Sequence, residues 1–244
     1  MKINMMKRSD IYFGVACIVV LLPFFVCRPL YEAFLWATMH HPFMMAFLKF
    51  GILSTAGECI GCRIRTGEYV PKGFGVVPRG ITWGFLGMLI TAAMTIFSTG
   101  VPAVLAMLGI TPTEGTYADL LKTGILTSRS GYHVLAAFAV SVFMNCLFAP
   151  VFMVLHKVSD THIMEHGGTI GGYFSRVEFG RIFTNLDWET IWNFLFKKTI
   201  PLFWIPAHTL TFLLPPEWRV LFAALLGVML GVFMSLAARN RFAK

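Results

Sequence analysis

Three ionisable residues stand inside long apolar stretches of the chain, namely Lys49, Glu58 and His208, and Asn145 is an uncharged polar residue in a similar setting. A charge at the middle of a membrane costs on the order of 3 kcal/mol, so such a group usually faces a bundle interior or a water-filled cavity. Lys49 and Glu58 are nine residues apart, which places them about half a turn out of phase on a helix. Glu58 therefore needs a partner on another helix, or water. These four residues are the candidates for lining a path for polar solutes.

A second group of residues has the spacing of a catalytic motif. His162, Glu165 and His166 form HxxEH, the inverted zinc-protease signature, in which two imidazoles bind the metal and the carboxylate is the general base. That chemistry needs a helix and a third ligand, whereas here the motif precedes a glycine-rich stretch that predicts a loop. Short motifs of this kind recur by chance. We therefore expect no enzyme activity, no metal and no cofactor, and keep a membrane-embedded zinc hydrolase as an alternative.

Cys59 and Cys62 form a CxxC within an apolar stretch, and the chain has five cysteines in all. Free cysteine commonly behaves as a small buried hydrophobe. We interpret this pair as packing residues rather than as a redox pair or half of a metal site, and expect no disulfide framework.

The composition of the chain predicts the solvent that surrounds it. Of the 244 residues, 57% are apolar and only 13% are charged, which is too apolar for an ordinary soluble domain of this length. Hydrocarbon cannot pair a bare backbone, so long apolar stretches in lipid must be helical. The formal net charge of +8 resides in the segments between these stretches, as expected beside a membrane, and a nucleic-acid partner is therefore not expected.

The predicted fold class is all-α, a polytopic transmembrane helical bundle of about six spans within a range of four to six. The expected spans are residues 11–27, 43–62, 81–110, 132–155, 201–214 and 218–238. We expect the first to kink at Pro23 and to continue as a tilted helix through Trp36. Residues 156–187 are predicted to form a loop. Residues 188–196 resemble an interfacial helix that ends at Lys197 and Lys198, before a short, proline-broken fifth span.

The distribution of basic residues predicts the orientation of the chain. With the N-terminus inside, fifteen of the twenty Lys and Arg residues fall on the cytoplasmic side and four fall outside, namely Arg28, Lys122, Arg129 and Arg219. This bias favours an even number of spans with both termini in the cytoplasm. Because no Arg- and Ser-rich amphipathic leader is found, we expect a plasma (inner) membrane, with an organellar membrane as the alternative.

Glycine pairs four residues apart indicate how the helices associate. Gly57 and Gly61, Gly80 and Gly84, and Gly227 and Gly231 show the small-residue spacing that lets helix backbones approach closely in lipid. Together they predict a compact bundle.

Two sets of residues resemble motifs of the peroxisomal 22-kDa membrane proteins and their mitochondrial inner-membrane relatives, the Mpv/PMP family. The opening set is His41, Pro42, Gly51, Gly57, Glu58, Arg79 and Gly87, and the closing set is Trp204, Pro206, His208, Thr211, Phe212, Pro216 and Arg219. The sequence departs from the family pattern where Glu58 replaces Asp, His208 replaces Gln and Thr211 replaces Asn. Pro206 is displaced by one position, Cys62 or Arg63 stands where a Gln is usual, and Ala92 and Ala93 replace a Gly-Pro pair.

The resemblance covers residues 41–236 and implies two parts, residues 1–40 with a cytoplasmic tail and an extra first span, and residues 41–244 with the Mpv/PMP-like helical domain. It implies a small integral membrane protein of a family proposed to form poorly selective channels for metabolites. The expected partners are the lipid bilayer and a small polar solute, and a homo-oligomer stays open. The alternative outside transport is a structural or lipid-organising membrane protein.

Overall fold

The computed structural model describes residues 7–113, 115–125 and 130–241, and this part of the chain is helical without strands. The all-α fold class is confirmed. In chain order the helices are α1 (Arg8–Val26), α2 (Arg28–His40), α3 (Pro42–Thr66), α4 (Val76–Met107), α5 (Tyr117–Leu121), α6 (Gly131–Leu147), α7 (Ala149–Glu165), α8 (Ile170–Tyr173), α9 (Phe179–Thr184), α10 (Trp188–Thr190), η1 (Ile191–Trp204), α11 (Ile205–Leu213) and α12 (Pro216–Arg241).

Several helices are long and apolar enough to cross a membrane, as in an integral membrane protein. Among the described residues, α1, α3 and α4 meet this condition by length and composition, and α6 with α7 adds a fourth crossing if this pair, bent by 46°, is one span. The 25 residues of α3 rise about 38 Å, more than the roughly 30 Å of a bilayer core. The other two expected spans lie in η1, α11 and α12, and their crossing stays a prediction.

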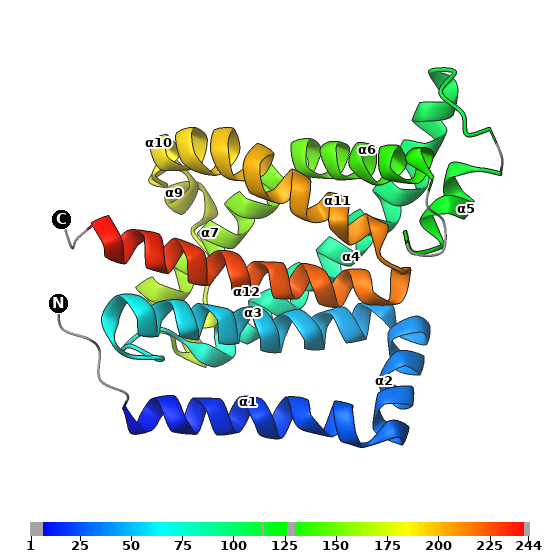
Figure 1. Ribbon diagram of the computed structural model, residues 1–244. Coiled ribbons are helices and arrows are strands. Elements are labelled where there is room, and N and C mark those ends of the chain that lie inside the picture. Colours follow the sequence, from blue (N-terminus) through cyan, green and yellow to red (C-terminus); the bar gives the residue numbers. More distant parts are fainter. Residues whose placement is uncertain (1–6, 114, 126–129, 242–244) are drawn as a thin grey trace.

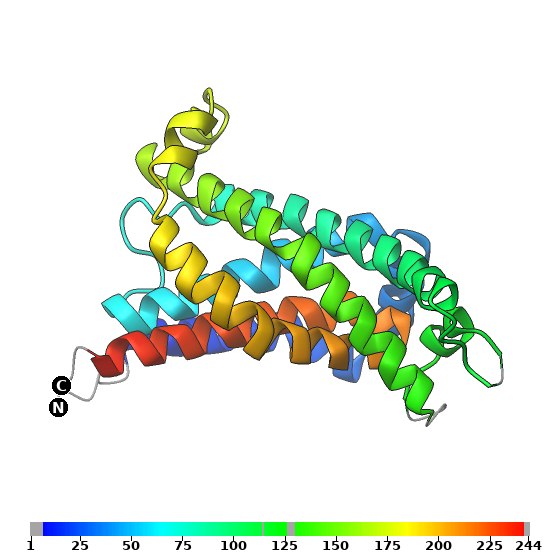
Figure 2. The ribbon, with the colours of Figure 1, turned by 90° about the horizontal axis from the view of Figure 1, so that it is seen from above.

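The long helices run side by side and bring several connections to one end of the bundle. The start of α1, the end of α12, the α3–α4 connection and the short helices α8 and α9 all lie at this end (Figures 1 and 2). We call it the α8–α9 end. Most segments that the charge distribution assigns to the cytoplasm therefore share one end, as an even number of crossings requires.

The first two helices differ from the expected single tilted helix. The chain breaks at Cys27, whose backbone is extended, and α2 lies across the end of the bundle opposite to the α8–α9 end (Figure 1). The prediction that the first helix continues through Trp36 is wrong. Pro29 stands in the first turn of α2, where its missing amide proton costs nothing, and so it favours a new helix start.

Helix α1 buries none of its side chains and is attached to the bundle near its ends. At its start, the Asp10 carboxylate accepts hydrogen bonds from Arg63 at 2.7 Å, and Lys7 Nζ donates to the Gly67 carbonyl oxygen at 2.9 Å. The Phe13 ring stacks on Tyr69 with centroids 4.4 Å apart. At its other end, α1 packs against α2.

The predicted loop over residues 156–187 is also wrong in its first third. Helix α7 continues to Glu165 and ends at Gly167 and Gly168, whose positive φ angles of 66° and 68° suit glycine. The glycine signal was therefore real, but it marks the end of a longer helix. This extension carries His156 and Asp160 into the bundle.

The expected break between an interfacial helix and a short fifth span is absent from the described structure. Helix η1 is wound as a π-helix, in which each amide pairs with the fifth residue before it, and it passes through Pro201 into α11 without a gap. The change to α winding falls near Pro206, which has no amide proton to leave unpaired. The proline-rich segment is thus continuous.

Close glycine contacts hold the central helices together. A Cβ added at Gly57 would lie 2.9 Å from the Cα of Val228 in α12, and one at Gly51 would lie 2.9 Å from the Gly80 carbonyl oxygen in α4. The Phe47 ring fills the space beside Gly84, where a Cβ would lie 2.5 Å from it. The predicted close approach of helix backbones is confirmed at Gly57 and at Gly80, whereas Gly84 makes room for a side chain. The apolar core is built by α3, α4, α5, α6, α11 and α12.

Candidate functional site

Helix α3 contributes side chains to two cavities that lie at different heights along it. The first, which we call the Glu58 cavity, has a volume of about 460 Å³ and is lined from α3, α4, α7, α12 and residues 71–74. The second, the Lys49 cavity, has a volume of about 320 Å³ and is lined from α2, α3, α4, α11 and α12. Nine residues of helix separate Glu58 from Lys49, which is a rise of about 13 Å.

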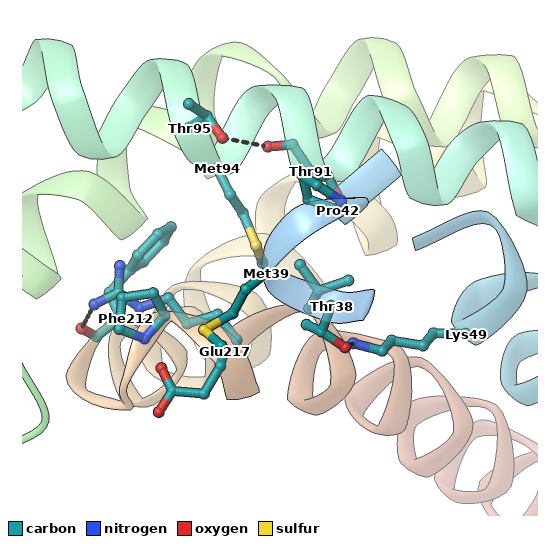
Figure 3. Close-up of a pocket in the computed structure, with 12 residues that line it drawn as sticks. Thr38, Met39, Pro42, Lys49, Thr91, Met94, Thr95, Phe212 and Glu217 are labelled. Atoms are coloured by element: carbon teal, nitrogen blue, oxygen red, sulfur yellow. Dashed lines mark hydrogen bonds between the residues drawn. The ribbon is translucent and has the colours of Figure 1, made fainter. Parts of the chain in front are cut away.

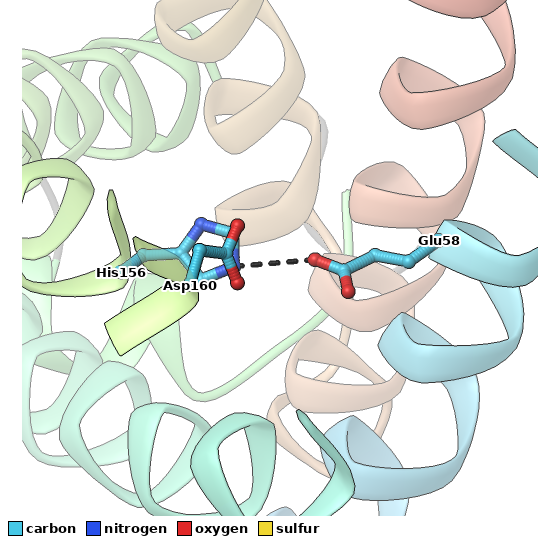
Figure 4. Close-up of side chains that lie close together, drawn as sticks. All are labelled: Glu58, His156 and Asp160. Atoms are coloured by element: carbon cyan, nitrogen blue, oxygen red, sulfur yellow. Dashed lines mark ion pairs between the residues drawn. The ribbon is translucent and has the colours of Figure 1, made fainter. Parts of the chain in front are cut away.

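The Glu58 cavity holds a cluster of four charged or titratable side chains from three helices. Arg79 Nη1 on α4 donates hydrogen bonds to Glu58 on α3 and to Asp160 on α7, both at 2.7 Å. His156, one turn before Asp160 on α7, places its Nε2 3.2 Å from a Glu58 oxygen and 3.5 Å from an Asp160 oxygen (Figure 4). The expectation that Glu58 finds its partner on another helix is confirmed.

Aromatic rings and a backbone carbonyl fix the two basic members of this cluster. Arg79 Nε donates to the Phe74 carbonyl oxygen at 2.8 Å, and its guanidinium lies 4.5 Å from the centre of the Phe74 ring. The His156 ring lies 4.4 Å from the Trp83 ring. The Arg79 side chain is 7% exposed, whereas Glu58 and Asp160 are each 20% exposed and reach the cavity. The buried Arg79 guanidinium thus holds the carboxylates of Glu58 and Asp160 at the edge of the cavity.

Glu58, His156 and Asp160 could also hold a metal ion, since one ligand atom from each lies within 4.8 Å of the others. Arg79 Nη1, however, stands 2.7 Å from both carboxylates and already supplies positive charge between them. A divalent cation would have to compete with this buried guanidinium. The geometry is therefore that of an ion-pair network that borders a cavity.

His162 and Glu165 lie on α7 and His166 caps its end, and each of the three side chains contacts another partner, although the buried His162 Nδ1 has none among the described residues. His162 Nε2 lies 3.2 Å from the Tyr173 carbonyl oxygen, and His166 Nδ1 lies 2.8 Å from the His162 carbonyl oxygen. Glu165 accepts two hydrogen bonds from Arg181, and this carboxylate raises the pKa of the guanidinium. Among the described residues the three side chains do not form a grouped set of metal ligands.

In the Lys49 cavity, the lysine is buried at 5% exposure. Its Nζ donates to the Thr38 hydroxyl at 2.8 Å (Figure 3) and lies 4.6 Å from the centre of the Phe34 ring. Arg219 lines the same cavity and donates to the carbonyl oxygens of Leu214, Phe212 and Leu121. Two cations thus border a space whose remaining walls are mainly apolar side chains and threonines.

Asn145 and His208 border neither cavity. The Asn145 amide donates to the Ser141 carbonyl oxygen at 2.9 Å within α6, and the Ser141 hydroxyl donates to the Ile205 carbonyl oxygen at 2.7 Å. His208 is buried on α11, with Trp204 5.2 Å away between ring centres. The structure therefore brings Asn145 and His208 to the packed contact of α6 and α11. That these two residues line a solute path stays a prediction.

Some residues in and between the two cavities are not indicated by the sequence pattern. The sequence pattern predicts a loop at His156 and Asp160, although their spacing of four residues is typical of one helix face. Between the cavities, the hydroxyls of Ser54 and Thr55 on α3 are buried and have no hydrogen-bond partner among the described residues. Serine and threonine give little sequence signal because their hydroxyls are usually satisfied by the preceding helical turn.

Among the family-motif residues, Pro42 and Pro216 border the Lys49 cavity with Phe212 and Arg219, whereas Gly57 and Arg79 border the Glu58 cavity. Gly87 packs against Phe50, since a Cβ there would lie 2.6 Å from the Phe50 Cβ. The two motif sets are thus distributed over both cavities and the helix contacts between them.

Over the described residues, the fold and the site define an all-helical protein with several apolar helices of membrane-spanning length and two cavities that charged side chains border. Comparison with known proteins gives no match, whether with family models, curated proteins or solved structures. The resemblance to the Mpv/PMP family therefore stays a prediction that rests on the motif residues alone.

Proposed function

We propose that this protein passes small polar solutes across a membrane along α3, through the Lys49 and Glu58 cavities. The observation that carries the proposal is the presence of two cavities bordered by charged side chains along one helix of membrane-spanning length, with the buried hydroxyls of Ser54 and Thr55 between them. Buried polar groups in a membrane are costly unless they pair or meet water, so such groups in succession favour a path that water and solutes enter.

The segment between the cavities is closed in this structure. Phe50 is 2% exposed, and the backbones of α3 and α4 meet at Gly51 and Gly80. Passage of a solute therefore requires α3 and α4 to shift relative to each other, a movement of 1–2 Å being typical of helix shifts. Such a movement would also have to shift the Phe47 and Phe50 rings of α3, which fill the spaces beside Gly84 and Gly87 in α4.

Flux through the reconstituted protein tests the proposal. We expect discrete currents in a planar bilayer, or solute release from liposomes, and a change of conductance or charge selectivity in the variant Glu58→Gln. Glu68→Gln, in the exposed α3–α4 connection, is the matched control because Glu68 borders neither cavity and should leave conduction unchanged. Conduction unaffected by Glu58→Gln in folded protein would remove Glu58 from the path, and a silent bilayer would refute the function.

A structural or lipid-organising role is the competing proposal. It interprets the Glu58, Arg79, His156 and Asp160 network as an interhelical clamp, and it predicts no flux of any solute. The two cavities favour the transport proposal, because a clamp needs no space beside its ion pairs.

A further inference from the structure

We infer that the Lys49 cavity binds an anionic group, a phosphate or a carboxylate, between Lys49 and Arg219. The binding of an anion in this cavity is argued from the geometry of the cavity alone. The further step, that small anions are the transported solutes, rests on the proposed function.

The first support is an incompletely used ammonium group. A lysine ammonium has three N–H donors, and among the described residues Lys49 has one oxygen partner, Thr38, together with the face of the Phe34 ring. No carboxylate of the described residues lies within ion-pair distance of Lys49. A charge that is 95% buried without a counter-charge is costly, and a bound anion in the adjoining cavity would remove that cost.

The second support is the balance of charge around the cavity. Lys49 and Arg219 face a single acid, Glu217, so the lining carries one excess positive charge. Arg219 is 7% exposed and is held by carbonyl oxygens rather than by a carboxylate. Its position is therefore fixed by the backbone, and its charge remains available to a ligand.

The third support is that the Glu58 cavity has the same sign of charge. Its lining includes four cations, Arg65, Lys72, Arg79 and Lys157, against the two acids Glu58 and Asp160. Clefts lined by one sign of charge concentrate ions of the opposite sign. A small anion would thus meet an excess of positive charge at both cavities on α3.

The size of the cavity limits the ligand. About 320 Å³ is at the lower end of the range for small-molecule sites, so the ligand is a small anion or the phosphate group of a lipid. The apolar lining from Met39, Met94 and Val220 suits a short hydrocarbon portion next to the charged group.

Calorimetric titration of the purified full-length protein with inorganic phosphate, and separately with succinate, tests the site at constant ionic strength. We expect saturable binding of at least one probe, and a loss of about tenfold or more in affinity for Lys49→Met, the size of one charge-assisted hydrogen bond. Lys49→Arg should retain binding. Lys198→Met is the control, because Lys198 is exposed on η1 and borders neither cavity.

A second variant keeps the test decisive if Lys49→Met does not fold. Glu217→Gln removes the one acid of the cavity and should tighten anion binding several-fold. Absence of binding by either probe to folded wild-type protein would overturn the inference, as would equal affinities in wild type, Lys49→Met and Glu217→Gln.

The source of the anionic group is distinguished by the lipid environment. In nanodiscs of phosphatidylcholine and of phosphatidylglycerol, a free anion should bind with similar affinity in both. Loss of phosphate binding only in phosphatidylglycerol, together with co-purification of that lipid by wild type but not by Lys49→Met, would assign the cavity to a lipid headgroup. Anion binding without flux would refute the proposed function alone, whereas flux of cations without anion binding would refute this inference alone.

Discussion

Arg79 Nη1 donates a hydrogen bond to Glu58 across the contact of α3 and α4 at 2.7 Å, with the arginine side chain 93% buried. Asp160 accepts from the same atom, so a single guanidinium neutralises carboxylates from two other helices.

Replacement of Arg79 by Gln should destabilise the protein strongly. It leaves two partly buried carboxylates with His156 as their one basic neighbour in the cluster, and loss of one partner of a buried pair costs on the order of 3 kcal/mol. Thermal unfolding in detergent measures the effect, with Arg176→Gln on an exposed segment as control. The double variant Glu58→Gln with Arg79→Gln should recover part of the loss, because one unpaired charge is gone. Equal stability of Arg79→Gln and Arg176→Gln would contradict the structure.

Gly57→Ala should loosen the contact of α3 and α12. Its Cβ would lie 2.9 Å from the Val228 Cα, a backbone atom that cannot move aside by itself, and overpacking of this kind costs about 1–3 kcal/mol. Gly100→Ala in α4 is the matched control, since its Cβ meets nothing within 4 Å and alanine favours helix. The unfolding temperature should therefore fall for Gly57→Ala, whereas it should rise or remain unchanged for Gly100→Ala.

Purified protein should carry no stoichiometric zinc. Arg79 supplies positive charge between Glu58 and Asp160, and the HxxEH side chains are bound to other partners. Elemental analysis after passage over a chelating resin measures the content. One zinc per chain that is lost in Glu58→Gln, but kept in Glu165→Gln, would instead assign a metal site to Glu58, His156 and Asp160.

The start of α1 should depend on its ion pair with the bundle. Asp10→Asn weakens the contact to Arg63 and leaves the Lys7–Gly67 hydrogen bond and the Phe13–Tyr69 stacking to hold this end of α1, which buries no side chains. A spin label attached at Gly14→Cys has open space around it and should become more mobile in Asp10→Asn. Glu32→Gln, at an exposed pair with Arg28 on α2, should leave the spectrum unchanged.

Acidification should loosen the N-terminus of α10. Asp187 accepts hydrogen bonds from Thr190, from its hydroxyl and from its backbone amide at 3.0 Å, and these lower the pKa of the carboxyl. A pKa that is lower in the folded than in the unfolded state gives stability that is present above the unfolded value and is lost as pH falls through the folded value. Exchange of the Thr190 amide, corrected for its intrinsic rate, should therefore accelerate at low pH. Asp187→Asn retains a capping oxygen and should not show this dependence.

Part of the fold and of the site follows from local sequence signals. Runs of apolar residues determine which segments become long helices, because a backbone in lipid has no other way to pair its polar groups. The glycine spacing indicates the close contacts, and the position of Glu58 within an apolar run indicates that it needs a partner on another helix. Each of these properties depends on residues within a few turns of one another.

The tertiary structure alone decides which residues meet. Arg79 is 21 residues from Glu58 and Asp160 is 81 residues from Arg79, so their pairing depends on how α3, α4 and α7 are rotated and offset. The extension of α7 beyond residue 155 also depends on tertiary contacts. Its polar residues His156 and Asp160 find their partners on α3 and α4, which the local sequence does not indicate. The cavities are likewise volumes between helices, and no single segment encodes them.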